Sequence, residues 1–451
     1  MANRNSTIRK WTGTTALAMA CGLAAILAAC GETGGPEPGE PEPGGAIKVE
    51  VVKKDGGYLL LRGGEPYTIK GAGLGHDYME NFASHGGNSF RNWGVDSVEE
   101  GLRLLDQAEA LGLTVAMCLD IGRERQGFDY DDETLVARQF ERIHEQVMGM
   151  KDHPALLLWI IGNEPDMHYS NPKVFDAING ISRMIHEVDG KHPTTTTLAS
   201  SFTPDLARLV EERAPDLDIV SLQKYADVVN VPRYIREAGI DQPYLVTEWG
   251  PQGHWEVEET AWGAPIEPNS SEKAQMYQHH YETAVSAVPE QILGSYVFFW
   301  DQKQERTPTW YSLFLPDGSE TESIDYMHHV WNGTWPENRA PQVQEMLLDG
   351  QSSGTDIVLE TGGRYETALF ATDPDGDALS YTWVLKRESE ATQVGGDREE
   401  VPEVLEGLIE SSDAGTANLT APATPGAYRL FVYVHDGRGS AGYANTPFLV
   451  E

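Results

Sequence analysis

Cysteine is scarce in this chain, with three among 451 residues. Cys21 and Cys30 lie near the N-terminus, and Cys118 lies in the apolar run Thr-Val-Ala-Met-Cys-Leu, which is typical of a buried strand. This inventory excludes a disulfide framework and a clustered Cys/His zinc site. The hydrophobic content of 40% is enough for a large core. We therefore expect a fold stabilised by its own core. We also expect no metal and no cofactor.

Basic residues are also few. Lys and Arg together number 33 against 70 Asp and Glu, which gives a formal net charge of −37. A strongly acidic chain is repelled by nucleic acid and by anionic lipid, so the composition excludes both as electrostatic partners. A neutral polymer would not be repelled, whereas a polyanionic one would need local basic patches. The charge therefore favours a highly soluble, exported protein with a neutral partner.

The N-terminal apolar stretch, residues 16–29, is too short to span a bilayer as a helix. It follows the basic residues Arg4, Arg9 and Lys10, a pattern typical of an export signal. It ends in Leu-Ala-Ala-Cys30, which resembles the bacterial lipoprotein signal and implies cleavage before Cys30 and lipidation of its thiol. An ordinary signal peptide is the alternative. The resemblance implies a cell-envelope protein that contacts the membrane through a lipid anchor only, at the outer membrane or cell surface.

The sequence divides into a signal peptide (1–30), a linker (31–46) and two domains. The linker is rich in Gly, Pro and Glu, so it is expected to be disordered. Over residues 47–337 a small hairpin is followed by alternating strand-like and helix-like stretches. Over residues 338–451 helical periodicity disappears, and short apolar runs between turn clusters predict a β-sandwich.

Eight apolar stretches of the larger domain predict strands, and most are separated by helical patterns. The strands are expected at 68–73, 87–92, 113–119, 155–162, 193–198, 217–223, 243–248 and 292–300, and the helices at 97–111, 132–151, 173–188, 204–214 and 270–288. This alternation matches an α/β fold of the (β/α)8 TIM barrel type. A doubly wound sheet is the alternative, but no Gly-x-Gly-x-x-Gly sequence opens a helix.

The most informative stretch is residues 155–166. An uncharged run, Ala-Leu-Leu-Leu-Trp-Ile-Ile, predicts a strand buried on both faces, and it is followed at once by Gly-Asn163-Glu164-Pro. Barrel enzymes place their active sites at the carboxyl ends of the strands. A carboxylate at the end of a hydrophobic strand is placed to have a raised pKa, as a general acid requires. The alternative is that Asn163 or Asp166 caps the next helix.

Residues 243–250, Pro-Tyr-Leu-Val-Thr-Glu248-Trp-Gly, repeat this arrangement. Glu164 would follow strand four and Glu248 strand seven, so both carboxylates would face one site. Such a pair suits glycosidic bond cleavage, which needs a proton donor and a nucleophile or base. Other strand ends supply further candidates for this site, some of them with a structural alternative: Arg91, Tyr225, Trp300, His76, Trp249 and the rival carboxylate Asp120.

The barrel resembles glycoside hydrolase clan A, with features of families 2 and 5, over roughly residues 47–335. The resemblance is carried by Arg91, Trp-x-x-Gly-Asn163-Glu164-Pro, Tyr225, Thr-Glu248-Trp-Gly and Trp300. It implies that Glu164 is the acid/base and Glu248 the nucleophile of a retaining enzyme, with carboxyl groups about 5 Å apart. It also implies that Asn163 holds the sugar 2-hydroxyl, that Arg91 and Tyr225 orient and ionise Glu248, and that Trp300 forms the floor of the site.

Six aromatic residues near strand ends suggest an extended cleft, with the segment 249–269 as one wall: Trp249, Trp255, Trp262, Trp300, Trp310 and Tyr311. We therefore expect an endo-acting β-glycosidase on a neutral β-linked polysaccharide, a β-glucan or β-mannan. A transglycosylase on the same scaffold and a non-catalytic surface glycan-binding lipoprotein are the alternatives. The joint presence of both glutamates and their supporting residues argues against the latter.

The C-terminal domain resembles immunoglobulin-like or cadherin-like modules, which implies a spacer or a weak carbohydrate binder. Its sequence Asp373-x-Asp375-x-Asp377 lacks the glycine and the final glutamate of an EF-hand calcium loop. We expect these aspartates to form a turn.

Overall fold

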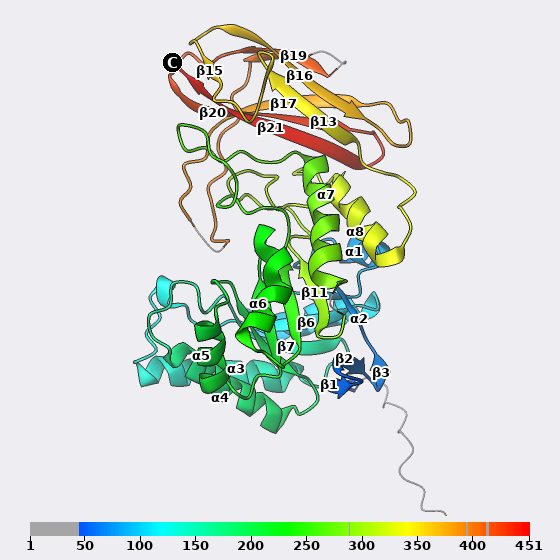
Figure 1. The fold of residues 1–451 in the computed structure, drawn as a ribbon, viewed down its shortest axis with the longest axis vertical. Helices are drawn as coiled ribbons and strands as arrows, with labels where there is room; N and C mark the ends of the chain where they lie inside the picture. Colours follow the sequence, from blue (N-terminus) through cyan, green and yellow to red (C-terminus); the bar gives the residue numbers. More distant parts are fainter. Residues whose placement is uncertain (1–44, 288, 394–395, 412–414) are drawn as a thin grey trace, which may run out of the picture. The chain divides into compact units, whose positions relative to one another are not determined.

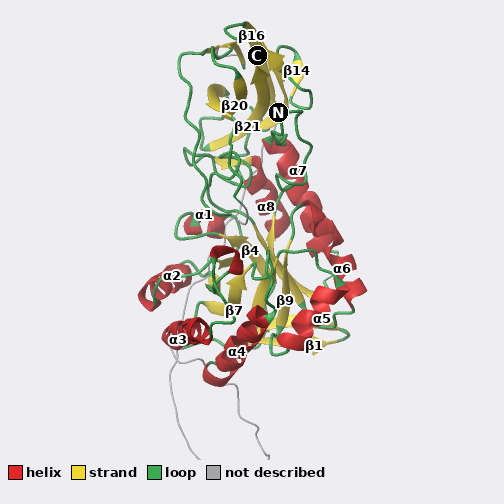
Figure 2. Cartoon of the chain, turned by 90° about the vertical axis from the view of Figure 1, so that its left-hand side faces the viewer, coloured by secondary structure: helices red, strands yellow, loops and turns green. Residues whose placement is uncertain are grey.

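The computed structural model describes residues 45–451, except for residues 288, 394–395 and 412–414 (Figures 1 and 2). The predicted signal peptide, Cys30 and nearly all of the linker lie outside these residues, so the lipid anchor stays a prediction. Within the described part of the chain, no helix has the length and apolar character needed to span a bilayer.

Eight parallel strands close into a barrel in the order of the chain, because the last strand pairs with the first. All eight lie where the sequence predicts them. They are β4 (Ile69–Gly73), β5 (Ser89–Arg91), β6 (Thr114–Leu119), β7 (Leu156–Asn163), β8 (Thr194–Leu198), β9 (Ile219–Gln223), β10 (Tyr244–Trp249) and β11 (Ile292–Val297). The expected TIM barrel is therefore confirmed.

Helices lie outside the strands (Figure 2). They are α1 (Met79–Ser84), α2 (Val98–Ala110), α3 (Glu133–Met150), α4 (Lys173–Val188), α5 (Pro204–Arg213), α6 (Val231–Ala238), α7 (Ser270–His280) and α8 (Glu322–Asn332). The helix expected over 270–288 begins with a capping box of Asn269 and Glu272, but its α-helical part ends at His280. There the chain widens into a π-helical turn, Tyr281–Val285.

A small antiparallel sheet closes the amino end of the barrel. It consists of β1 (Val49–Lys54), β2 (Gly57–Arg62) and β3 (Glu65–Pro66). Val49 and Leu60 pack against apolar side chains of the barrel strands. The Tyr58 amide donates to the Glu290 carbonyl (2.7 Å), just before β11 begins. Because this end is covered, the carboxyl ends of the strands provide the accessible face.

The C-terminal residues form two β-sheets around one apolar core, as expected of a sandwich. One sheet has the order β12 (Glu320–Thr321), β21 (Ser440–Val450), β20 (Gly426–His435) and β17 (Ser380–Arg387), and β15 (Val358–Leu359) also pairs with β21. The other has the order β14 (Gln351–Ser352), β13 (Gln342–Leu348), β16 (Arg364–Thr372), β19 (Thr416–Thr420) and β18 (Ile409–Ser411). The core between them includes Trp383, Leu419 and Phe448.

A buried polar cluster joins the barrel to the sandwich. Glu267 forms an ion pair with Lys273, and both side chains are almost fully buried. From the sandwich, the Asn445 side chain donates to Glu267 (2.7 Å), and Arg429 donates to the Pro265 carbonyl (2.8 Å). The ion pair is therefore shielded from water by both domains.

Replacing Glu267 by Gln should lower the free energy of unfolding by about 3 kcal/mol or more, because a buried ion pair that loses one partner leaves an uncompensated charge. Urea denaturation measures the change. The control is Glu410→Gln, which removes an exposed pair with Arg364 and should change the free energy by less than about 1 kcal/mol. Equal small effects of the two substitutions would contradict a structural role for the cluster.

Candidate active site

A cavity of about 560 Å³ lies at the carboxyl ends of the strands, within the size range of small-molecule sites. Glu164 and Glu248 both line it, together with Asn163 and Tyr225. The structure therefore brings these four predicted residues together, and with them Trp255, which the sequence predicts as part of the cleft. The remaining lining residues are Trp93, Met167, His168, Ala199, Gln223, His254, Trp255, Phe298, Phe299, Gln302, Lys303, Glu305 and Gly396.

The end of β7 has an unusual backbone that sets the direction of Glu164. Gly162 has a φ of 80°, and a Cβ there would lie 2.6 Å from the side chain of Ile121. Glu164 itself has a φ of 53°, a left-handed conformation that strains a residue with a side chain by about 1–3 kcal/mol. Its amide donates to the Thr197 carbonyl of β8 (3.1 Å), which holds the turn in place.

The capping alternative for this stretch is wrong. Helix α4 begins at Lys173, and the residue before it is Pro172, which supplies no side-chain cap. The Asp166 carboxylate instead accepts hydrogen bonds from the backbone amides of Ala199 (3.0 Å) and Ser200 (2.8 Å), beyond the end of β8.

Arg91, at the end of β5, connects the two glutamate-bearing strands. Its side chain is fully buried. One guanidinium nitrogen, Nη2, donates to Oδ1 of Asn163 (2.7 Å), and Nη1 lies 3.1 Å from Oε1 of Glu248. Gln223 also donates to Asn163 Oδ1 (2.9 Å). These bonds fix the Asn163 side chain with its oxygen toward Arg91, which leaves the amide nitrogen as its remaining donor group.

Three donors converge on the Glu248 carboxylate. Besides Arg91, the Trp93 indole donates to Oε1 (3.0 Å), and the Tyr225 hydroxyl donates to Oε2 (3.2 Å). An ionised carboxylate is the acceptor-only form that suits such a set. Burial raises the pKa of Tyr225 well above its usual value, so its hydroxyl stays a donor at neutral pH.

Glu164 is held differently. Burial first, and then the negative charges of Glu248 and Asp166, raise its pKa to about 8, although Arg125 and Arg91 act in the opposite direction. A carboxyl group with this pKa is protonated at neutral pH and can donate a proton. The two glutamates of the cavity are therefore an acid and a carboxylate.

Two tryptophans expected in the site do not reach it. Trp300 is fully buried, stacks on Trp331 with ring centres 5.5 Å apart, and donates to Asn81. Trp249 is fully buried against Tyr277, on the opposite side of β10 from Glu248, because neighbouring residues of a strand face opposite sides. Their predicted contacts with substrate are corrected: the aromatic walls are Trp93, Trp255, Phe298 and Phe299.

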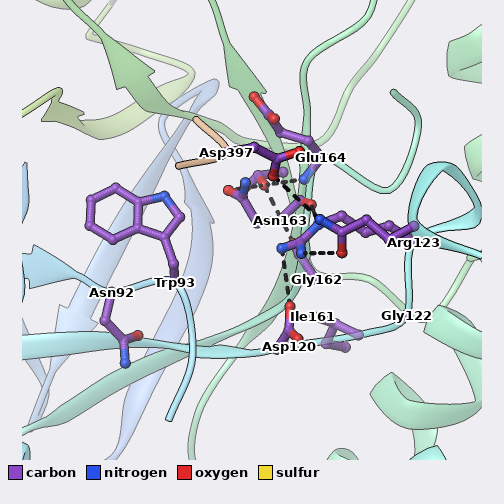
Figure 3. Close-up of polar contacts among 12 residues, drawn as sticks. Asn92, Trp93, Asp120, Gly122, Arg123, Ile161, Gly162, Asn163, Glu164 and Asp397 are labelled. Atoms are coloured by element: carbon purple, nitrogen blue, oxygen red, sulfur yellow. Dashed lines mark hydrogen bonds and ion pairs between the residues drawn. The ribbon is translucent and has the colours of Figure 1, made fainter. Parts of the chain in front are cut away.

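A second concave region, a groove of about 890 Å³, contains His76 and Asp120. His76 is exposed and hydrogen-bonded to Gln107 (3.0 Å), so it lies outside the cavity of the glutamates. Asp120 pairs with Arg123 (3.0 Å), which also donates to the Asn163 carbonyl (Figure 3). Trp93 lines both the cavity and the groove, so its side chain borders the two.

Several lining residues cannot be inferred from strand ends alone. Gln223, the last residue of β9, has the position of a site residue and could have been found. His254, Lys303, Glu305 and Gly396 come from loops or from the other domain, where no periodic pattern marks them.

Two acidic clusters within the described residues have oxygen or nitrogen atoms close enough to hold a metal ion: Asp106, Glu109 and His153, and Asp373, Asp375 and Asp377. Neither cluster lines the cavity. In the second, Oδ1 of Asp373 accepts from the amides of Asp375 and Asp377 (2.9 Å each), which is the expected turn.

Comparison with known proteins agrees with this geometry. Residues 92–284 match the family model of glycosyl hydrolases family 2, TIM barrel domain. A β-glucuronidase of Streptococcus agalactiae serotype V is 25% identical over 241 residues, which cover 45% of this chain and 39% of the relative. The chain thus spans less than half the length of that curated relative.

Solved structures of low sequence identity were also found. They include a calcium-binding mutant of Bacteroides uniformis beta-glucuronidase 2 (14% identity, TM-score 0.48, covering 88% of this chain and 47% of that one). They also include an endo-1,4-beta-mannanase from Eisenia fetida (13% identity, TM-score 0.44, covering 64% of this chain and 96% of that one).

A closed barrel with two glutamates in one cavity is consistent with a glycoside hydrolase barrel. The family model covers the barrel from the end of β5 to the turn after α7. The barrel of this chain is therefore similar, over residues 92–284, to the TIM barrel domain of glycosyl hydrolases family 2.

We expect Glu164 to titrate with a midpoint near pH 8, visible as the difference in infrared carboxyl absorption between the native protein and Glu164→Gln. Glu248→Gln should move this midpoint to lower pH, because it removes a like charge that disfavours ionisation of Glu164. A midpoint at the usual value for glutamate, or one that does not respond to Glu248→Gln, would contradict the assignment.

Proposed function

We propose that this protein is a retaining β-glycoside hydrolase that cleaves internal bonds of a neutral β-linked polysaccharide, a β-glucan or β-mannan. The observation that carries the proposal is the unequal pair of glutamates, one protonated by burial and the other bound by three donors. The lipid anchor expected at Cys30 would hold the enzyme in the cell envelope, where it would meet such polymers.

In the proposed reaction, Glu164 donates its proton to the leaving glycosidic oxygen while Glu248 attacks the anomeric carbon. The bond to the leaving sugar breaks, and a glycosyl ester forms on Glu248. Glu164, now a carboxylate, then removes a proton from water, which attacks the ester and releases the second sugar product. Asn163 lines the same cavity as the two glutamates, and its amide nitrogen suits the 2-hydroxyl of the sugar.

The charge of the cavity supports a neutral substrate. A sugar carboxylate would need a cation to pair with. Among the described lining residues, the cation is Lys303, and it already pairs with Glu305 at 2.7 Å. His254 is neutral at physiological pH, because burial and Arg306 lower its pKa to about 4.

The shape supports action within a polymer. Trp93 borders both the cavity and the groove of Asp120 and His76, so a chain of sugars that passes over Trp93 would contact both. Trp255, at the cavity edge, is 59% exposed and offers a flat face to a further sugar ring. His76 would contact the substrate in the groove rather than at the cleaved bond.

Hydrolysis of a panel of β-glucans, mannans, galactans and xylans tests the function. We expect activity on one neutral polymer and a loss of several orders of magnitude in kcat/KM for both Glu164→Ala and Glu248→Ala. Azide should restore turnover of Glu248→Ala and give a glycosyl azide of inverted configuration. The control is Asp241→Asn, which alters an exposed carboxylate paired with Lys53 and should keep full activity.

The sizes of the products decide between the possible outcomes of this experiment. Shorter chains identify a hydrolase, whereas longer chains would identify a transglycosylase and contradict the hydrolytic second step. Binding of a polymer without any cleavage or extension would overturn the enzymatic function.

An aryl β-glucuronide should be a poor substrate, at least 100-fold lower in kcat/KM than the matching aryl glycoside of the preferred neutral sugar, because a buried carboxylate without a partner costs several kcal/mol. Initial rates on paired chromogenic glycosides measure the ratio. A preference for the glucuronide would contradict the neutral substrate class.

A further inference from the structure

The loop between β17 and β18, residues 388–408, extends from the sandwich toward the barrel (orange in Figure 1). Its described residues are 388–393 and 396–408. Gly396 lines the cavity of the two glutamates, whereas the other lining residues belong to the barrel domain. Gly396 has a φ of 73°, and a Cβ there would lie 3.2 Å from the Lys303 ammonium nitrogen. The loop therefore forms part of the cavity wall at close range.

Two carboxylates hold this loop on the barrel. Asp397 pairs with Arg125 (3.2 Å) and accepts a hydrogen bond from Gln126 (3.3 Å), in the segment after β6. Glu399, whose side chain is 1% exposed, accepts from the Arg306 amide (2.7 Å) and lies 3.6 Å from its guanidinium. Both contacts join a carboxylate of the C-terminal domain to an arginine of the barrel domain.

Arg125 also acts on the catalytic acid. Its side chain is 9% exposed, and its positive charge is close enough to Glu164 to oppose the rise of that residue's pKa. Figure 3 shows Asp397 drawn with the residues at the end of β7. The negative charge of Asp397 offsets part of the field of Arg125. The Asp397 side chain is 42% exposed, so water screens part of this interaction.

Building on the proposed function, we propose that the sandwich completes the active site of the barrel, and that Asp397, through its ion pair with Arg125, is a positioning residue for the catalytic acid Glu164. The C-terminal domain thus contributes to the reaction itself and is more than a spacer. The C-terminal domain contacts the barrel through the buried cluster of Glu267 and Lys273, which holds the domain that carries the loop in place.

Other charged and titratable groups also face Glu164, from several elements, and remain unchanged when Asp397 is altered. They are Glu248 and Arg91 on the barrel strands, Asp166 after β7, and Lys224 and Tyr225 after β9. An effect of Asp397 is therefore recognised as a change in the pKa of Glu164 that occurs only when Arg125 is present.

The test measures the ionisation of Glu164 in the full-length protein carrying Asp397→Asn. Without the countercharge, Arg125 stabilises the Glu164 carboxylate more strongly. The alkaline limb of the kcat/KM profile and the infrared midpoint of Glu164 should both move to lower pH by roughly half a unit or more. Arg125→Gln should move them to higher pH, and Asp397→Asn should have no further effect in that background.

Further variants test whether Asp397 acts through its charge. Asp397→Glu, which keeps the charge, should restore most of the native profile. Glu410→Gln, a sandwich carboxylate paired with Arg364, should leave the profile unchanged. If Asp397→Asn melts at the native temperature and leaves both readouts unchanged, the positioning role is overturned. If the native protein cleaves no glycoside but the infrared midpoint still shifts, the proposed function fails while the effect of Asp397 on the ionisation of Glu164 stands.

Discussion

The buried guanidinium of Arg91 is the interaction on which the site depends. A fully buried arginine is tolerated only when its donors are paired, because an uncompensated buried charge costs several kcal/mol. Here Asn163 on β7 and Glu248 on β10 supply the partners. Because buried Arg91 on β5 needs both contacts, it holds the ends of these three strands in place. Removing Arg91 would leave the Glu248 carboxylate short of a donor and release the amide that is proposed to hold the sugar.

The remaining geometry makes the two glutamates unequal. β7 is buried along its whole length, and the strained residue after it, Glu164, lines the cavity and is itself buried. Glu248 lies in a strand of similar burial but meets Arg91, Trp93 and Tyr225. Burial and neighbouring negative charges favour the protonated form of Glu164, whereas the three donors favour the ionised form of Glu248, as acid/base chemistry at neutral pH requires. The small sheet covers the amino ends of the barrel strands, so the two glutamates lie at the carboxyl ends, where the cavity is.

The barrel strands and both glutamates could be predicted from the sequence, because apolar runs and their abrupt ends are local signals. The direction of Trp300 could not, since its packing against Trp331 joins distant parts of the chain. The direction of Trp249 could have been predicted, because alternation along the strand places it opposite Glu248. β21 shows no alternation because nearly all its residues are buried. The Arg125–Asp397 pair joins residues 272 positions apart, and no pattern in the chain announces a contact of that kind.

The most direct test of the account is to incubate the protein with a 2-deoxy-2-fluoro aryl glycoside of its preferred neutral sugar, and to locate the label by peptide mass spectrometry. Fluorine at carbon 2 slows hydrolysis of the glycosyl ester, so the intermediate accumulates. If Glu248 is the nucleophile, one fluoroglycosyl group should be found, attached to Glu248. A label on another carboxylate, or rapid turnover of natural substrate with inversion at the anomeric carbon, would contradict it.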